Sequence, residues 1–124
     1  MRIDKAKALQ MFWEQFRWPA YDEGTVPDDA GYPRITYNVV EDELDRPVAM
    51  RASLWDRSTS WQSVSEKAAE ISEALTKLWP PAIPFDGGRV YLTKGSPFAQ
   101  RMTDEDDMVR RIYINIGAEY FSAY

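Results

Sequence analysis

The sequence contains neither cysteine nor histidine, and these two absences exclude several classes of function at once. Without cysteine the chain has no disulfide framework and no thiol chemistry, which fits a reducing compartment. Without histidine it lacks the commonest general base near neutral pH and the commonest metal ligand. A zinc site is therefore not expected, and only hard oxygen ligands for magnesium, calcium or manganese remain.

Positive charge is also scarce, because 15 lysines and arginines stand against 20 aspartates and glutamates and leave a net charge of −5. Tight binding to nucleic acid needs a positive footprint, so stable binding to a duplex is not expected. An acidic protein can still line a passage through which DNA moves without sticking. No apolar run approaches the roughly 18 residues of a membrane span, and residues 1–7 hold no apolar core, so neither a membrane segment nor a signal peptide is expected.

The composition is that of one globular domain over residues 1–124, with 44% apolar and 14% aromatic residues. Apolar residues at helical spacing predict one helix over residues 4–17 and a second over residues 61–78. Pro19 ends the first, and the stretch 79–81 (WPP) ends the second.

Alternation of apolar and polar side chains predicts four strands, over residues 34–42, 47–55, 89–94 and 108–117. The first two form a hairpin around a turn at 43–47, and the acidic, turn-rich stretch 19–32 forms a loop. The stretch 95–101 reads as irregular or weakly extended. Together these elements predict an α+β fold in the order α-β-β-α-β-β, with a mostly antiparallel four-stranded sheet and helices packed on one face.

Four consecutive acids at residues 104–107 raise the question of a metal site. One interpretation is a small magnesium-dependent phosphodiesterase that uses Asp104, Asp106 and Glu119. However, neighbouring acids splay apart, and the spacing of an EF-hand is absent. The other interpretation is a polar turn that opens a strand, in which the acids pair with nearby arginines: Arg101, Arg110 or Arg111.

The aromatic residues are numerous for one small core, and tryptophan, tyrosine and arginine are enriched in protein interfaces. The segments 55–57 and 97–101 combine these residue types. No catalytic, cofactor-binding or metal-binding residue is assigned. The candidate subunit or partner interface consists of Trp55, Arg57, Phe98, Arg101, Arg110 and Arg111.

Five stretches carry a family resemblance: residues 27–33, 35–38, 52–61, 94–101 and 106–115. The most specific parts are 55–60 (WDRSTS) and 96–101 (SPFAQR). Over about residues 15–121, the sequence resembles the small neck and tail-completion proteins of long-tailed bacteriophages, known as tail terminators or minor capsid proteins.

The resemblance implies a sheet flanked by helices that assembles into a homo-hexameric ring. Such a ring caps the tail tube, joins it to the head and has no catalytic residues or cofactors. The implied partners are the chain itself, the tail-tube protein and a neck or head-completion protein, with DNA only passing through. The implied location is the head–tail junction of the virion, after assembly in the host bacterial cytoplasm.

Within this frame, we expect residues 95–107 to form a long connection between the last two strands that projects toward a neighbouring subunit or the tube. Its ion pairs would use Arg101, Arg110 and Arg111. Three alternatives stay open: a head-completion or adaptor protein of the same neck, the magnesium-dependent phosphodiesterase, and a cytoplasmic protein-binding module with the same α+β layout.

Overall fold

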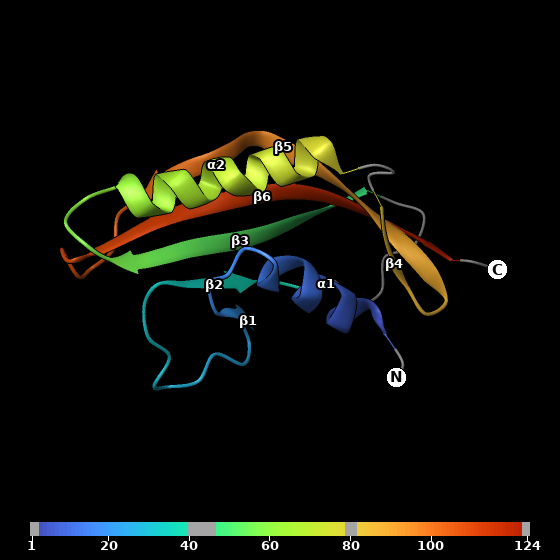
Figure 1. The fold of residues 1–124 in the computed structure, drawn as a ribbon, viewed down its shortest axis with the longest axis horizontal. Helices are drawn as coiled ribbons and strands as arrows, with labels where there is room; N and C mark the ends of the chain where they lie inside the picture. The colour runs from blue at the N-terminus through green and yellow to red at the C-terminus, as the bar shows by residue number, and fades with distance from the viewer. Residues whose placement is uncertain (1–2, 40–46, 79–81, 123–124) are drawn as a thin grey trace.

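The computed structural model describes residues 3–39, 47–78 and 82–122, which form one six-stranded sheet and two helices (Figure 1). The strand order is β1-β2-β3-β6-β5-β4, in which β1 and β2 run parallel and every other neighbouring pair runs antiparallel. The elements are α1 (Lys5–Glu14), β1 (Ala20–Asp22), β2 (Arg34–Tyr37), β3 (Pro47–Arg57), α2 (Gln62–Lys77), β4 (Ala82–Phe85), β5 (Gly88–Met102) and β6 (Val109–Ser122).

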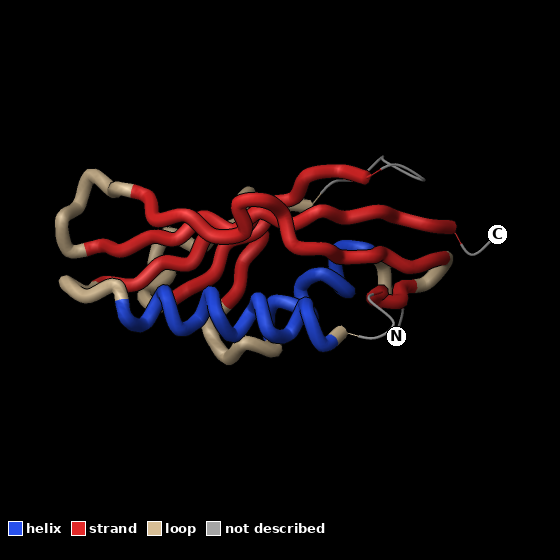
Figure 2. Tube along the Cα trace, turned by 90° about the horizontal axis from the view of Figure 1, so that it is seen from above, coloured by secondary structure: helices blue, strands red, loops and turns tan. Residues whose placement is uncertain are grey.

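The sheet is curled, and both helices lie on the same side of it, as Figure 2 shows from above. We call this side the inner face and the opposite side the outer face. The helix α1 contacts β1 and β4, and α2 contacts β3, β5 and β6. Over the described residues, neither helix is long and apolar enough to span a membrane.

The strand β6 organises the sheet because it pairs along most of its length with a long strand on each side. Its register with β3 runs from Val109 opposite Arg57 to Glu119 opposite Pro47, and β5 lies along its other edge. Successive side chains of a strand point to opposite faces. From Ile112 onward the inward residues of β6 are buried: Ile112, Ile114, Ile116, Ala118 and Tyr120.

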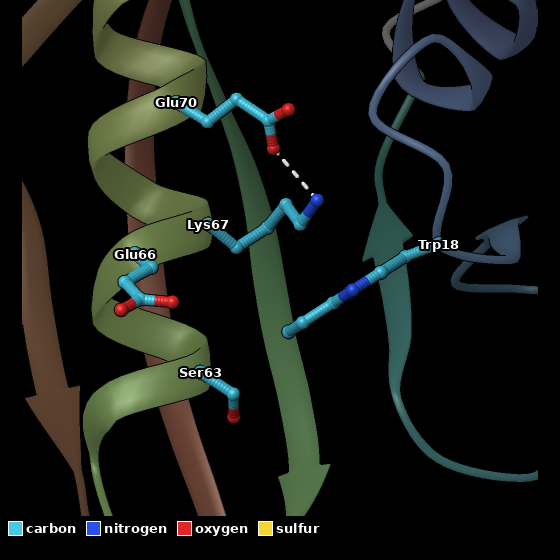
Figure 3. Close-up of a pocket in the computed structure, with 5 residues that line it drawn as sticks. All are labelled: Trp18, Ser63, Glu66, Lys67 and Glu70. Atoms are coloured by element: carbon cyan, nitrogen blue, oxygen red, sulfur yellow. Dashed lines mark hydrogen bonds and ion pairs between the residues drawn. The ribbon is translucent and has the colours of Figure 1, made fainter.

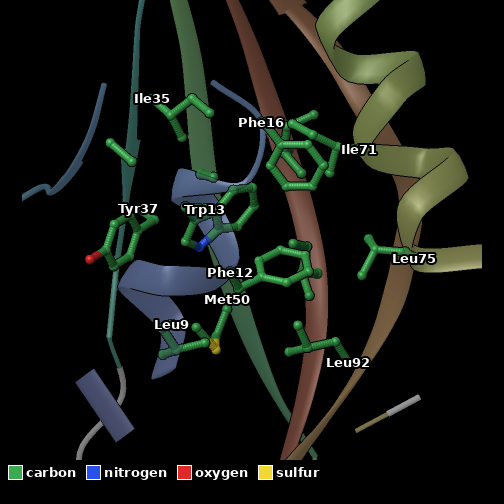
Figure 4. Close-up of a cluster of buried hydrophobic side chains, with 14 of the residues drawn as sticks. Leu9, Phe12, Trp13, Phe16, Ile35, Tyr37, Met50, Ile71, Leu75 and Leu92 are labelled. Carbon is green, nitrogen blue, oxygen red and sulfur yellow. The ribbon is translucent and has the colours of Figure 1, made fainter. Parts of the chain in front are cut away.

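The core forms where the two helices meet these inward residues (Figure 4). Buried positions on α2 are spaced three or four apart, as expected for an amphipathic helix: Val64, Ala68, Ile71 and Leu75. From α1, the ring of Trp13 stacks on that of Tyr37 with 6.1 Å between centroids. Burial raises the pKa of the Tyr37 hydroxyl to about 12, with smaller contributions from Asp22 and Glu14.

The predicted fold class is wrong in its strand count and in its element order. The sequence reading missed β1, which has three residues inside the acidic loop and forms a strand by pairing in parallel with β2. It also missed β4, an edge strand that contains Pro84. The sheet is therefore six-stranded and mixed, not four-stranded in the order α-β-β-α-β-β.

The predicted long connection at 95–107 is also wrong, although the stretch 95–101, expected to be irregular or weakly extended, does contain an irregularity between Lys94 and Ala99. The strand β5 continues to Met102 because its pairing with β6 shifts register between Lys94 and Ala99. The side-chain amide of Asn115 donates a hydrogen bond to the carbonyl oxygen of Pro97, 2.9 Å away, inside this irregularity. The true connection is only residues 103–108. The predicted turn at 43–47 and the predicted helix stop at 79–81 fall almost wholly outside the described residues.

The glycine that opens β5 gives the first testable prediction. A Cβ atom at Gly88 would lie 2.0 Å from the backbone oxygen of Phe121, on β6, whereas a Cβ at Gly31 would meet nothing within 4 Å. Gly88→Ala must therefore displace backbone, and we expect it to destabilise the protein by about 1–3 kcal/mol. Gly31→Ala should change stability by less than about 0.5 kcal/mol. Urea unfolding of both variants measures this difference, and equal midpoints would contradict the β5–β6 packing described here.

Candidate functional site

The outer face carries a row of arginines stacked on aromatic rings, which we call the arginine–aromatic cluster: Tyr32, Arg34, Trp55, Arg57 and Arg111. The register places Arg34 opposite Trp55, and Trp55 opposite Arg111, across three adjacent strands. The guanidinium carbon of Arg34 lies 4.5 Å from the Tyr32 ring centroid, and that of Arg111 lies 4.5 Å from the Trp55 centroid. The guanidinium carbon of Arg57 lies 5.4 Å from the centroid of the same Tyr32 ring. The cluster is therefore continuous across β2, β3 and β6.

Two buried hydroxyl groups hold the centre of this cluster in place. The indole Nε1 of Trp55 donates to the Thr36 hydroxyl at 3.0 Å, and Nε of Arg111 donates to the Ser53 hydroxyl at 3.1 Å. Thr36 and Ser53 are both buried. Because the indole and the guanidinium each have a fixed acceptor, the cluster keeps its arrangement without a bound partner.

The charge on the outer face is opposite in sign to that of the whole chain. The outward positions of the described strands carry five arginines and one glutamate, a net charge of +4: Arg34, Arg51, Arg57, Arg89, Arg111 and Glu119. Loop carboxylates neutralise two of these arginines, since Glu23 pairs with Arg51 and Asp106 pairs with Arg57. The remaining arginines keep their charge available on an acidic protein.

A second arginine–aromatic group lies on the inner side at the same end of the sheet. Here Trp61, just before α2, has the guanidinium carbon of Arg101 at 4.8 Å and that of Arg110 at 5.5 Å from its ring centroid. Arg110 also donates to the carbonyl oxygens of Asp107 and Thr59 at 2.7 and 3.2 Å. These contacts tie the start of α2 to the turn between β5 and β6, next to a pocket of about 250 Å³.

The acids at 104–107 form a self-bonded turn. The Asp104 carboxylate accepts from the backbone N–H of Asp106 at 3.0 Å, and the Asp106 carboxylate accepts from that of Met108 at 2.9 Å. The bond from Met108 lowers the pKa of the Asp106 carboxyl, desolvation opposes that effect, and Arg57 adds to the lowering. The acids therefore form a polar turn that opens a strand, but among the described residues the arginine that pairs with it is Arg57, and not Arg101, Arg110 or Arg111 as predicted.

The magnesium site that the phosphodiesterase alternative requires is not formed by Asp104, Asp106 and Glu119. Glu119 lies ten residues beyond Val109 along β6, which at about 3.3 Å per residue puts it roughly 33 Å from the turn that holds Asp104 and Asp106. Within residues 3–39, 47–78 and 82–122, no three acidic side chains converge in a way that could hold a metal ion.

The six predicted interface residues do not form one site. Trp55, Arg57 and Arg111 lie together in the outer cluster. Arg101 and Arg110 lie together on the inner side against the ring of Trp61.

Phe98 belongs to neither group, because it is partly buried and packs against the core. The sequence reading also missed Tyr32, Arg34 and Trp61. Arg34 could have been identified as an interface candidate from its pairing with Trp55, but that pairing is known only once the register of β2 on β3 is known.

An open pocket of about 370 Å³ lies between α2 and the segment that follows α1 (Figure 3). Its central residue, Lys67, donates to the carbonyl oxygen of Phe16 at 2.7 Å and pairs with Glu70 at 2.6 Å. The ammonium also lies 5.2 Å from the Trp18 ring centroid. The other polar groups of this pocket have partners outside it, since Ser63 donates to Asp56 and Glu66 accepts from Gln62. Lys67 therefore joins α2 to the segment that follows α1.

A chain from a virion structure has the same fold. The structure is titled "Virion of native gene transfer agent (GTA) particle", and the match covers 95% of this chain and 94% of that chain. The TM-score is 0.62 at 16% sequence identity, so the likeness is one of fold. No protein-family model and no curated protein matches the sequence.

The lowered pKa of the Asp106 carboxyl predicts a pH dependence of stability. The bonds to this carboxylate stabilise the folded state above its ordinary pKa of 3.8 and are lost as the pH falls through the lower folded value. We expect Asp106→Asn to be less stable than the wild type at neutral pH, and the difference to shrink as the pH falls below 3.8 and through the lowered folded pKa.

Thermal or urea unfolding at neutral and acid pH measures this difference. The control is Asp107→Asn, because the side-chain carboxylate of Asp107 makes no hydrogen bond or ion pair within the described part of the chain. The stabilising role of the turn would be contradicted by a deficit in Asp106→Asn that stays the same size at both pH values.

Proposed function

We propose that the protein is a structural component of a phage-like virion, and that it acts as a tail terminator. In this role it closes the end of the tail tube as a homo-hexameric ring at the head–tail junction and joins the tube to the head. Its partners are other copies of the chain, the tail-tube protein and a neck or head-completion protein.

The observation that carries this proposal is the fold likeness to a chain of a gene transfer agent virion over nearly the whole length of both chains. The sequence resemblance in residues 55–60 and 96–101 supports it independently of the fold. These two segments contain Trp55, Arg57 and Arg101, all of which take part in the stacked groups at one end of the sheet.

The alternative within the same class is a head-completion or adaptor protein of the neck, which would use the same fold with different partners. No specific observation favours the magnesium-dependent phosphodiesterase, because Asp104 and Asp106 are engaged in their own turn and Glu119 lies at the other end of β6.

Native mass spectrometry over a wide range of concentrations tests the proposal, with and without the tail-tube protein. We expect a hexamer, or a series of oligomers that ends at six, either alone or on the tube. A ring of another size that does not bind the tail-tube protein would favour the adaptor alternative. A stable dimer that does not bind the tail-tube protein would contradict the proposal and favour a protein-binding module.

A further inference from the structure

The outer face of the sheet is uncovered within the described residues, because both helices lie on the inner face (Figure 2). Its outward strand positions, five arginines and one glutamate, carry a net charge of +4, of which Glu23 and Asp106 neutralise two, while the whole chain carries −5. The rest of the chain therefore carries −9. A second copy of the protein thus offers the charge that this face lacks, and opposite surface charges accelerate and orient association.

The geometry of the cluster fits carboxylates better than stacked bases. The register places Arg34 and Arg111 on the strands that flank Trp55, and their guanidinium carbons lie 5.6 and 4.5 Å from its ring centroid. The indole is thus occupied by the chain's own cations and is not free to stack on a nucleobase. The face therefore presents guanidinium groups in fixed positions, and guanidinium groups match carboxylates in shape and charge.

The surface most suited to this face is the turn between β5 and β6. It projects beyond the end of the sheet that is remote from the described end of β6 at Ser122 (Figure 1). Glu105 and Asp107 are exposed there, and within the described residues neither carboxylate makes a hydrogen bond or an ion pair. Met102 and Met108 flank the turn and are 38% and 45% exposed.

These two methionines add an apolar rim to the acidic turn. Among the described residues, the large hydrophobic side chains that are exposed are those of Met11, Met102 and Met108, so two of the three lie here. Methionine side chains adapt to irregular surfaces and make favourable contacts with aromatic rings. The turn therefore combines unpaired carboxylates with apolar contact area, and the hydrogen bonds of Asp104 and Asp106 fix its shape.

We propose that the acidic turn of one copy, with Glu105 and Asp107 flanked by Met102 and Met108, docks on the arginine–aromatic cluster of another copy. When each copy uses its turn toward one neighbour and its cluster toward another, the contact is heterologous and repeats from copy to copy, as a ring requires. This inference deepens the proposed ring and rests on it for the number of subunits, but the contact itself is tested separately.

Charge reversal on each side of the contact tests the proposal. Arg111→Glu on the face and the double change Glu105→Lys with Asp107→Lys on the turn should each weaken self-association at least about tenfold. Both sets combined in one chain should restore association toward the wild-type level, because the charges are exchanged. Raising the salt from about 50 mM to about 500 mM should weaken the wild type but is a less specific test.

Matched charge reversals away from both surfaces serve as controls. Lys7→Glu lies on α1, and Glu70→Lys with Glu73→Lys lies on α2; all three residues are exposed. These should leave association within about twofold of the wild type. Circular dichroism confirms that each variant is folded, and the turn variant keeps the test valid if Arg111→Glu unfolds, because the side chains of Glu105 and Asp107 have no partners to lose.

Sedimentation velocity of the chain alone and with a short duplex DNA gives the readout. The contact is supported if each reversal abolishes association and the combined chain restores it. If the oligomer then does not close at six, only the proposed ring fails. A hexamer that neither reversal weakens overturns the contact and leaves the ring standing. A wild type that stays monomeric at every concentration, or whose face binds DNA in preference to itself, also overturns the contact.

Discussion

The pairing of β6 with a long strand on each of its edges is the constraint on which both faces of the protein depend. Pairing with β3 holds β6 in one continuous register, and that register sends alternate residues to opposite sides. The inward set, which includes Ile112 and Ile114, builds the core under the helices. The outward set places Arg111 beside Trp55. A slip of one residue would bury the arginine and expose the isoleucines, so core and surface are specified by the same hydrogen bonds.

The partition of charge follows from this arrangement. An acidic chain gathers arginines on the sheet face that no helix covers, and buried hydroxyl groups on that face hold Trp55 and Arg111. Exposed ion pairs contribute little to stability on their own, so stability alone gives little reason for such a face. Binding to a partner surface of opposite charge would explain why the arginines gather on this face. The acidic turn at residues 104–107, read first as a metal site or a solvated turn, supplies such a surface at the end of the same strand.

The helices and the long strands could be anticipated from the sequence because their signals are local. The spacing of Val64, Ala68 and Ile71 marks α2, and the alternation through Ile112, Ile114 and Ile116 marks β6. The short strands could not be anticipated in the same way. Residues 20–22 become β1 only by pairing with β2, and the continuation of β5 past Pro97 depends on a shift of register against β6.

The site shows the same division between local and long-range information. Residue type marked Trp55, Arg57 and Arg111 as interface candidates, and the structure brings these three together. Residue type alone could not separate them from Arg101 and Arg110, which the strand register sends to the other face. Nor could it add Tyr32, which joins the cluster through its contacts with Arg34 and Arg57.

The absence of cysteine from the chain makes the most direct measurement simple, because every disulfide must come from introduced residues. One protein would carry Glu105→Cys in the acidic turn and another Tyr113→Cys on the outer face beside the cluster. Mixed under mild oxidation, the two should form a disulfide-linked heterodimer faster than either forms a homodimer, and high salt should slow it. Homodimers that form as fast as the heterodimer would show that the turn of one copy does not dock on the face of another.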